Sequence, residues 1–220
     1  MPDTSPQLIL TDDGSHSLFF PGLNETYHSR NGAMQESQHV FIANGLSRLS
    51  EMDEIAILEV GFGTGLNALL SLIYCEKSKQ KIRFTTLETF PIPVSIYQEL
   101  NYAKLDFNTQ FLKLHEAEWG SEIQIDGQFL LCKMNKPLQE FEASEKFDLV
   151  FYDAFGPPAQ PEMWSKEILN KVVTMMKSGG VFVTYCAKGQ VRRDLEACGL
   201  LMERLPGPPG KREMLRGTKL

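Results

Sequence analysis

The residues of this sequence best suited to chemistry begin with Glu59, which is followed at alternate positions by Gly61, Gly63 and Gly65. Closely spaced glycines allow positive backbone φ angles and let the backbone approach a ligand, because no Cβ atom intervenes. The spacing is not the G-x-G-x-x-G fingerprint of dinucleotide-binding proteins, since that pattern requires glycine where Leu66 stands. No G-x-x-x-x-G-K-[ST] phosphate-binding loop is present either. The acid and the glycines therefore predict a cofactor-binding turn of another kind.

Two further acids follow runs that have the composition of buried strands. Glu88 ends the alternating, β-branched run 81–87, and Asp153 ends the apolar run 147–152. Ligands of open α/β sheets bind outside the carboxyl ends of the strands. An acid at the end of the second strand accepts hydrogen bonds from ribose hydroxyls there, so we expect Glu88 to bind a nucleoside. We expect Asp153 to point into the same site.

The elements that must position these residues are read from hydrophobic periodicity and turn signals. Residues 55–60 predict a buried strand before the glycine turn, and 66–74 predict a helix after it. The other predicted strands are 7–11, 17–20, 81–87, 128–132, 147–152, 181–185, 200–205 and 213–216. The other predicted helices run from Asn31 or Gly32 to 49, and over 94–118, 164–177 and 190–198, with residues 178–180 (Ser-Gly-Gly) capping the helix 164–177.

This order of elements predicts an α/β fold of the Rossmann-like kind, with a mostly parallel seven-stranded sheet. Residues 200–216, with the Pro/Gly-rich loop 206–212, predict an antiparallel hairpin at the C-terminal end of the sheet. We expect residues 1–50 to form a small β-rich extension and a helix packed on the core. Residues 51–220 then form the cofactor-binding domain.

Composition places the chain among ordinary globular proteins. The 220 residues are 42% hydrophobic and 23% charged, and no apolar run approaches the roughly 20 residues of a membrane span. The N-terminal residues lack a signal-peptide pattern, and the four cysteines lack C-x-x-C spacing, so we expect a reduced cytoplasmic protein without a metal centre. The net charge is −6, yet residues 186–220 carry +4 and the rest −10. Such a basic end suits local contact with a polyanion, although a solvated C-terminal face has the same composition.

Several segments spread over nearly the whole chain carry a family resemblance. They are Tyr27-His-Ser, Gly32-Ala-x-x-Glu36-Ser, Val40-Phe41, Glu59-Val-Gly-Phe-Gly-Thr-Gly-Leu-Asn67, Asp153-Ala-Phe, Pro161-Glu-Met-Trp164, Gly179-Gly180, Val183-Thr-Tyr, Val191-Arg-Arg193 and Gly210-Lys-Arg-Glu-Met-Leu215. The glycine segment resembles motif I of S-adenosylmethionine-dependent methyltransferases. The whole set resembles the methyltransferase domain of the bifunctional tRNA-modifying MnmC proteins and their stand-alone counterparts, often called MnmD.

The resemblance implies methyl transfer from S-adenosylmethionine to the aminomethyl group of a tRNA wobble uridine, giving 5-methylaminomethyl-(2-thio)uridine. Bifunctional members also carry an FAD-dependent oxidase domain that supplies the amine. A chain of 220 residues has no room for that domain. We therefore expect no FAD oxidase activity and an amine supplied by a separate upstream enzyme.

The resemblance also implies roles for individual residues. Asp153 is the candidate catalytic residue, because a carboxylate beside the amine can accept an N–H and later the proton. Asn135 stands where many methyltransferases place an acid for the adenine amino group. The candidate cofactor-binding residues are Glu59, Gly61, Phe62, Gly63, Gly65, Asn67, Glu88, Asn135 and Asp153. The candidate tRNA-binding residues are Phe155 and Trp164 for base stacking, and Arg192, Arg193, Lys211 and Arg212 for phosphates.

Other interpretations stay open from the sequence alone. Asp153 also suits a loop cap or a contact to the cofactor's amino group. Phe155 and Trp164 suit an ordinary core, and Arg192 and Arg193 suit surface ion pairs. The protein as a whole is compatible with a small-molecule amine N-methyltransferase, an aminopropyltransferase-like enzyme, or a cofactor-binding module that presents tRNA to a partner.

Overall fold

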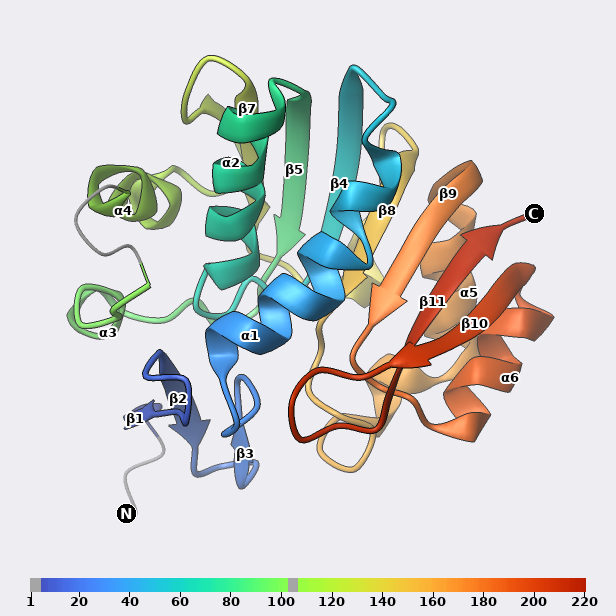
Figure 1. Cartoon of the computed structure of the whole chain (residues 1–220), viewed down its shortest axis with the longest axis horizontal. Helices are drawn as coiled ribbons and strands as arrows, with labels where there is room; N and C mark the ends of the chain where they lie inside the picture. Colours follow the sequence, from blue (N-terminus) through green and yellow to red (C-terminus); the bar gives the residue numbers. More distant parts are fainter. Residues whose placement is uncertain (1–4, 103–106) are drawn as a thin grey trace.

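The protein is described by a computed structural model over residues 5–102 and 107–220. Within these residues an eight-stranded sheet forms the centre. Its strands in chain order are β4 (Glu54–Val60), β5 (Lys81–Leu87), β6 (Glu122–Gln124), β7 (Phe129–Met134), β8 (Phe147–Tyr152), β9 (Met176–Thr184), β10 (Leu200–Pro206) and β11 (Glu213–Lys219). Their order across the sheet is β10-β11-β9-β8-β4-β5-β7-β6 (Figure 1). The five central strands are parallel, and β6, β10 and β11 are antiparallel to their neighbours. The predicted fold class is confirmed.

Helices cover both faces of the sheet. They are α1 (Ala33–Ser37), the π-helical segment η1 (Gln38–Ala43), the 3₁₀ turn η2 (Leu46–Leu49), α2 (Leu66–Ser78), α3 (Val94–Tyr97), α4 (Asn108–Glu116), the 3₁₀ turns η3 (Leu138–Glu140) and η4 (Pro161–Trp164), α5 (Lys166–Thr174) and α6 (Gly189–Ala197). α1, α2 and α4 pack on one face, and α5 and α6 on the other (Figure 1). In the part of the chain that the structure describes, none of these helices is long and apolar enough to traverse a bilayer.

β4 and β8, in the middle of the sheet, are largely apolar because both of their faces are buried. Alternate residues of β4 enter different cores: Ile55 and Ile57 pack on the α2 side, whereas Leu58 and Val60 pack on the α5 side. Glu59 therefore faces the α2 side, where it is fully buried below the glycine turn. Because the five central strands are parallel, their carboxyl ends lie at the same edge of the sheet. That edge is where the candidate acids lie.

A second, three-stranded sheet is formed by β1 (Gln7–Leu10), β2 (His16–Phe20) and β3 (Glu25–Thr26). It lies below the α2 side of the central sheet in Figure 1, near the carboxyl ends of the parallel strands. Asn101 ties it to the core, because its side chain accepts from His16 N at 2.7 Å and donates to Gly14 O at 2.9 Å. The predicted β-rich N-terminal extension is present, and the boundary at residue 50 stays a prediction.

Three predicted helices were wrong in extent. The helix predicted up to residue 49 passes into the π-helical segment and is interrupted at Gly45, where a Cβ atom would lie 2.4 Å from Phe41 O. In place of the helix predicted over 94–118, the described residues form two helices, α3 and α4. Between them Asn101 is hydrogen-bonded to the N-terminal sheet. Residues 103–106 of that prediction lie outside the described residues. The helix predicted from residue 164 starts after an N-cap at Ser165, whose Oγ accepts from Ile168 N at 3.3 Å.

The sheet also differs from prediction in two places. Residues 178–180 do not cap a helix but lie inside β9, which already pairs with β8 at Met176. Gly180 fits there because a Cβ atom would lie 2.9 Å from Lys177 O. The short edge strand β6 adds an eighth strand to the described sheet. It has only three residues, too few for a periodic pattern to be recognised.

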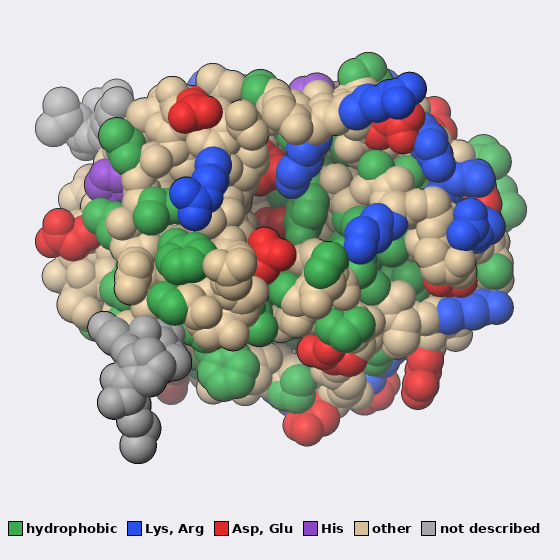
Figure 2. All heavy atoms as spheres, turned by 90° about the horizontal axis from the view of Figure 1, so that it is seen from below, with side chains coloured by type: hydrophobic (Ala, Val, Ile, Leu, Met, Phe, Trp, Pro, Cys, Tyr) green, Lys and Arg blue, Asp and Glu red, His purple; other side chains and the backbone are tan. Residues whose placement is uncertain are grey.

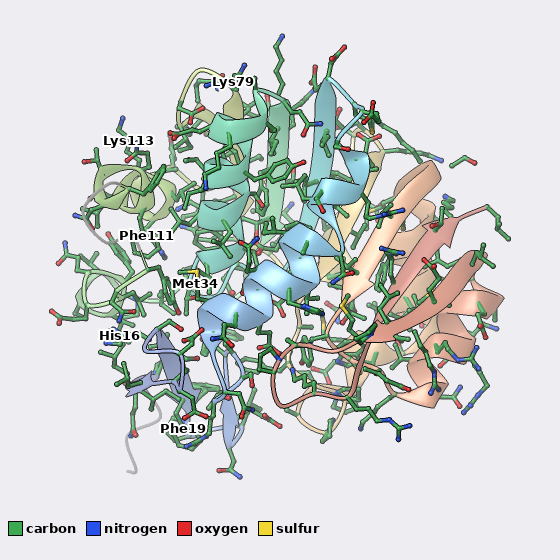
Figure 3. All side chains as sticks on the ribbon, viewed as in Figure 1. His16, Phe19, Met34, Lys79, Phe111 and Lys113 are labelled. Atoms are coloured by element: carbon green, nitrogen blue, oxygen red, sulfur yellow. The ribbon has the colours of Figure 1, made fainter. Side chains whose placement is uncertain are left out.

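The C-terminal end of α2 gives a direct test of local backbone strain. Lys79 (Figure 3) is exposed and adopts φ 65°, with its N–H donating to Cys75 O at 2.9 Å. Glycine is favoured at this left-handed position because it has no Cβ atom. We expect Lys79→Gly to raise the free energy of unfolding by about 0.5–1 kcal/mol in urea titrations. The control Ser78→Gly, at the last residue of α2, should lower it, because glycine has a lower helix propensity and the Ser78 Oγ that accepts from Gln80 N is lost. A Lys79→Gly variant that is no more stable than the wild type would refute the prediction.

Candidate cofactor and acceptor site

A cavity of about 1170 Å³ opens where β4, β5 and β8 end. Figure 2 views the molecule from this side and shows a recess with acidic side chains in it and basic side chains around it. Its walls come from the N-terminal sheet and the segment up to Glu36, the glycine turn, the segments that follow Glu88 and Asp153, the residues that follow β7 and β9, and the loop between β10 and β11. The predicted residues that line it are Gly61, Phe62, Gly63, Asn67, Glu88, Asp153, Phe155, Lys211 and Arg212.

The glycine turn has a backbone that side chains could not follow. Gly61 has φ 96°, and a Cβ atom there would lie 2.9 Å from Asp153 O. Gly65 has φ 74° at the N-cap of α2, and a Cβ atom there would lie 2.9 Å from His115 Nε2. The absence of side chains lets the turn fit between β8 and the start of α2. This cradle of bare backbone at a helix N-terminus suits the cofactor predicted from the sequence.

The Glu88 carboxylate connects the glycine turn with the segment that follows β5. Its Oε2 accepts from Gly63 N at 3.0 Å, and its Oε1 accepts from Phe90 N at 2.8 Å. Asn135 lies behind this segment, donating from Nδ2 to Glu88 O at 2.8 Å and to Thr89 O at 3.3 Å. Asn135 is not on the cavity wall, so it supports Glu88 from behind. Lys136, Pro137 and Leu138 line the cavity beside it.

Asp153 lies directly after β8, where its N–H donates to Val60 O at 3.1 Å. Its Oδ2 accepts from Asn67 Nδ2 at 2.9 Å, which links the acid to the helix after the glycine turn. Burial raises the pKa of Asp153 well above its ordinary value, and Glu36 adds to the rise, whereas the Asn67 hydrogen bond and Lys211 oppose it. A carboxyl group with a raised pKa is a stronger proton acceptor when ionised.

Aromatic rings form the wall next to Asp153. Phe155 lies parallel to Phe20 with 6.5 Å between ring centroids, and edge-on to Tyr27 at 5.1 Å. All three line the cavity. Trp164 does not line the cavity. It is buried, and its Nε1 donates to Phe155 O at 2.7 Å. Trp164 therefore supports the loop of Phe155 rather than facing a base.

An ion pair inside the cavity joins two segments 175 residues apart. Lys211 Nζ contacts the buried Glu36 carboxylate and lies 3.8 Å from the centroid of the Tyr185 ring. Glu36 Oε2 also accepts from Ser29 N at 2.7 Å. The Lys211 side chain is therefore directed into the cavity, whereas the neighbouring Arg212 is exposed. Sequence reasoning assigned no role to Glu36 or Tyr185; the only signal was their place in segments shared with the MnmC proteins.

The remaining predicted residues lie away from the cavity. Arg192 pairs with Glu196 one turn along α6, and Arg193 Nη2 donates to Gln190 at 2.8 Å. These contacts are the ordinary i, i+4 and i, i+3 pairs of an exposed helix face. Glu59 lies beneath the glycine turn and Gly65 lies at its α2 end, and neither residue lines the cavity.

His115 was not predicted and holds the glycine turn from outside the cavity. Its Nε2 lies 3.1 Å from Thr64 O, and its ring stacks on Tyr97 with 4.4 Å between centroids. Burial lowers the pKa of His115 to about 4, with Lys133 adding to the fall and the Thr64 bond opposing it. A neutral ring with its proton on Nε2 fits this contact.

The lowered pKa of His115 predicts an acid-sensitive contribution to stability. Between about pH 4 and 6.5 the unfolded chain binds a proton at this residue that the folded chain does not. The contribution is therefore complete above pH 6.5 and is lost as the pH falls towards 4. The free energy of unfolding of the wild type, relative to that of His115→Phe, should therefore decrease as the pH falls from 6.5 to 4. Histidine NMR titration should place His115 near pH 4; titration at its ordinary value would contradict the prediction.

The comparisons with known proteins agree with this site. A family model described as S-adenosyl-L-methionine-dependent methyltransferase matches residues 98–220, and the chain belongs to that family. The MnmC bifunctional protein of Azoarcus sp. (strain BH72), named for tRNA 5-methylaminomethyl-2-thiouridine biosynthesis, is 29% identical over 100% of this chain and 36% of its own length. The crystal structure of MNMC2 from Aquifex aeolicus superposes with a TM-score of 0.80 at 26% identity, covering 99% of this chain and 71% of that one.

The predicted resemblance to the MnmC methyltransferase domain and the S-adenosylmethionine cofactor are confirmed. The chain spans about a third of the length of the curated relatives it matches. Spermidine synthase from Thermotoga maritima shares the fold, with a TM-score of 0.54 at 10% identity over 99% of this chain and 82% of that one.

Proposed function

We propose that this chain methylates the primary amine of an aminomethyl group on the wobble uridine of tRNA, giving 5-methylaminomethyl-(2-thio)uridine. One observation carries the proposal. Asp153 lies in the same cavity as the glycine turn and Glu88 and is hydrogen-bonded to Asn67, the second residue of α2. A methyl donor held by the turn and an amine beside Asp153 would therefore meet in one chamber.

The residues present fit S-adenosylmethionine. The backbone cradle around Gly61 has no room for a side chain, and Glu88 offers carboxylate oxygens for ribose hydroxyls. When bound, the cofactor supplies a methyl group already activated by a sulfonium. The chain then has mainly to orient the amine, which contributes on the order of 7–11 kcal/mol in well-aligned reactions.

The amine needs a free lone pair to react. If its pKa in solution is like that of lysine, the neutral form costs roughly 4 kcal/mol at pH 7. Asp153 would accept one amine N–H to aim the lone pair and take up the proton released after transfer. Help of this kind is worth about 10²–10⁴-fold.

The walls of the cavity suit a nucleotide acceptor. Phe155, Phe20 and Tyr27 provide aromatic surface, and stacking on a base contributes about 1–3 kcal/mol. Lys136, Lys188 and Arg212 are basic residues on the wall, suited to phosphates that flank the flipped or exposed base. The names of the MnmC relatives support tRNA as the substrate.

The test is methyl transfer from labelled S-adenosylmethionine to tRNA carrying aminomethyl-uridine, beside the same tRNA carrying carboxymethylaminomethyl-uridine. We expect label only on the aminomethyl tRNA. Label on neither tRNA, with cofactor binding intact, would refute the proposal and favour a small-molecule amine as acceptor. Label on the carboxymethylaminomethyl form would refute the proposed selectivity for a primary amine.

A further inference from the structure

A primary ammonium group already lies inside the cavity, at the end of the Lys211 side chain. Its Nζ contacts the carboxylate of Glu36 and lies 3.8 Å from the centroid of the Tyr185 ring. All three residues line the cavity. A carboxylate and the face of an aromatic ring are groups by which proteins recognise alkylammonium ions. The cavity wall therefore contains a site whose chemistry matches an ammonium ion.

The walls of this site are held without the help of the lysine. The Glu36 side chain is only 6% exposed, and its Oε2 accepts from Ser29 N at 2.7 Å. The Tyr185 hydroxyl donates to Ala154 O at 2.9 Å. Among the described residues, Lys211 Nζ contacts only this carboxylate and this ring, and the lysine side chain is 31% exposed. The site would thus keep its walls if the lysine moved away.

The site lies next to Asp153. Ala154, whose carbonyl oxygen holds Tyr185, directly follows this acid in the chain, and Asp153 lines the same cavity. Burial is the main cause of the raised pKa of Asp153; Glu36 adds to the rise, and Lys211 opposes it. Both charges of the ion pair therefore act on the carboxyl group to which the proposed function brings the amine.

We propose that Glu36 and Tyr185 form the binding site for the primary ammonium group of the acceptor, and that Lys211 occupies this site until the acceptor displaces it. An aminomethyl group and the end of a lysine side chain are the same chemical group, a methylene carbon that carries a primary amine. At pH 7 an amine with the pKa of lysine is protonated, so the acceptor arrives in the form that the site holds. The identity of the acceptor rests on the proposed function.

Such a site also selects among acceptors. A hydroxymethyl group has no positive charge, so it cannot replace the lysine ammonium at Glu36. A carboxymethylated amine carries an additional carboxylate, which would lie among the carboxylates of Glu36 and Asp153. Like charges placed together in this way disfavour the wrong ligand. Glu36 is therefore a specificity-determining residue for an unsubstituted amine.

The direct test uses nuclear magnetic resonance of the wild type with bound S-adenosylhomocysteine, labelled with carbon-13 at lysine. The methylene group next to Lys211 Nζ lies by the Tyr185 ring, so we expect its protons to resonate upfield of those of other lysines. Lys211→Met and Tyr185→Leu should each remove this signal, which assigns it. Added 5-aminomethyluridine should move the signal to the ordinary lysine position, whereas the matched nucleoside 5-hydroxymethyluridine should not. No movement up to the solubility of the aminomethyl nucleoside, or equal movement with both nucleosides, would overturn the proposal.

Lys211→Met gives a second readout, because methionine keeps an apolar stem of similar length without the charge. If the lysine occupies the site in about nine-tenths of the molecules, its removal should lower the apparent Kd of 5-aminomethyluridine about tenfold. The Kd of 5-hydroxymethyluridine should not change. A raised Kd for the aminomethyl nucleoside in Lys211→Met would show that the lysine helps to bind the acceptor, and would overturn the proposal.

A pair of double variants tests the role of Glu36. Lys211→Met with Glu36→Gln should lose the gain in affinity for 5-aminomethyluridine. The control, Lys211→Met with Glu162→Gln, removes a negative charge from another part of the cavity wall and should keep the gain. Equal affinities in the two double variants would overturn the proposal. Methyl transfer to tRNA is measured separately: if it fails while these binding results hold, the proposed function is wrong and the ammonium site stands.

Discussion

Replacing Asp153 by asparagine should lower kcat for methyl transfer to aminomethyl-uridine tRNA by about 10²–10⁴-fold. Asparagine keeps an oxygen that can accept from Asn67 Nδ2, so the β8 end and the start of α2 should keep their hydrogen bond. It lacks a group that can take the proton released by the methylated amine. Single-turnover assays with labelled S-adenosylmethionine at saturating cofactor measure this step without product release.

The cofactor affinity of Asp153→Asn and of Asp153→Ala separates two roles for this acid. If Asp153 acts on the amine, both variants should bind S-adenosylhomocysteine with nearly the wild-type Kd in calorimetry. If instead it binds the cofactor's amino group, both should show a raised Kd and a rate that recovers at high cofactor concentration. The second pattern would contradict the catalytic assignment.

The parts of the site that were predictable are those encoded by local sequence. The strand before Gly61 is an apolar run interrupted only by Glu59 after residue 54, and the alternate glycines mark the turn at its end. Glu88 and Asp153 were correctly expected at strand ends, because parallel strands place their carboxyl ends at one edge of a sheet. Each of these inferences needs only residues close in the chain.

The parts that were missed depend on contacts between distant segments. The ion pair of Glu36 and Lys211 joins residues 175 positions apart, so no local pattern could show that this lysine points inward. Trp164 sits in a short 3₁₀ turn, and its burial follows from packing against Tyr152 and from the bond to Phe155 O. His115 reaches the glycine turn from α4, which packs on α2. Sequence alone identified the chemistry but not the supports that hold it in place.

The second large effect is expected on cofactor affinity when Glu88 is replaced. Its carboxylate accepts from Gly63 N in the glycine turn and from Phe90 N in the segment after β5. It also lines the cavity, where we expect the ribose hydroxyls of the cofactor. Removing it in Glu88→Ala takes away one charge-assisted hydrogen bond to a ribose hydroxyl, worth about 1.5–3 kcal/mol. The Kd for S-adenosylmethionine should therefore rise roughly 10- to 100-fold. At saturating cofactor kcat should change much less, because the acid does not face the amine.

Calorimetry with S-adenosylmethionine and S-adenosylhomocysteine measures the change, and Glu99→Ala is the control. Glu99 is an exposed acid just beyond α3 and does not line the cavity, so its removal tests the loss of one negative charge without the loss of a contact. Glu88→Gln should fall between the wild type and Glu88→Ala, since an amide keeps one acceptor for the two backbone N–H groups. Equal Kd values for Glu88→Ala and Glu99→Ala would show that the cofactor's ribose is held elsewhere. A lowered kcat at saturating cofactor would instead show that Glu88 positions the turn during transfer, through its bond to Gly63.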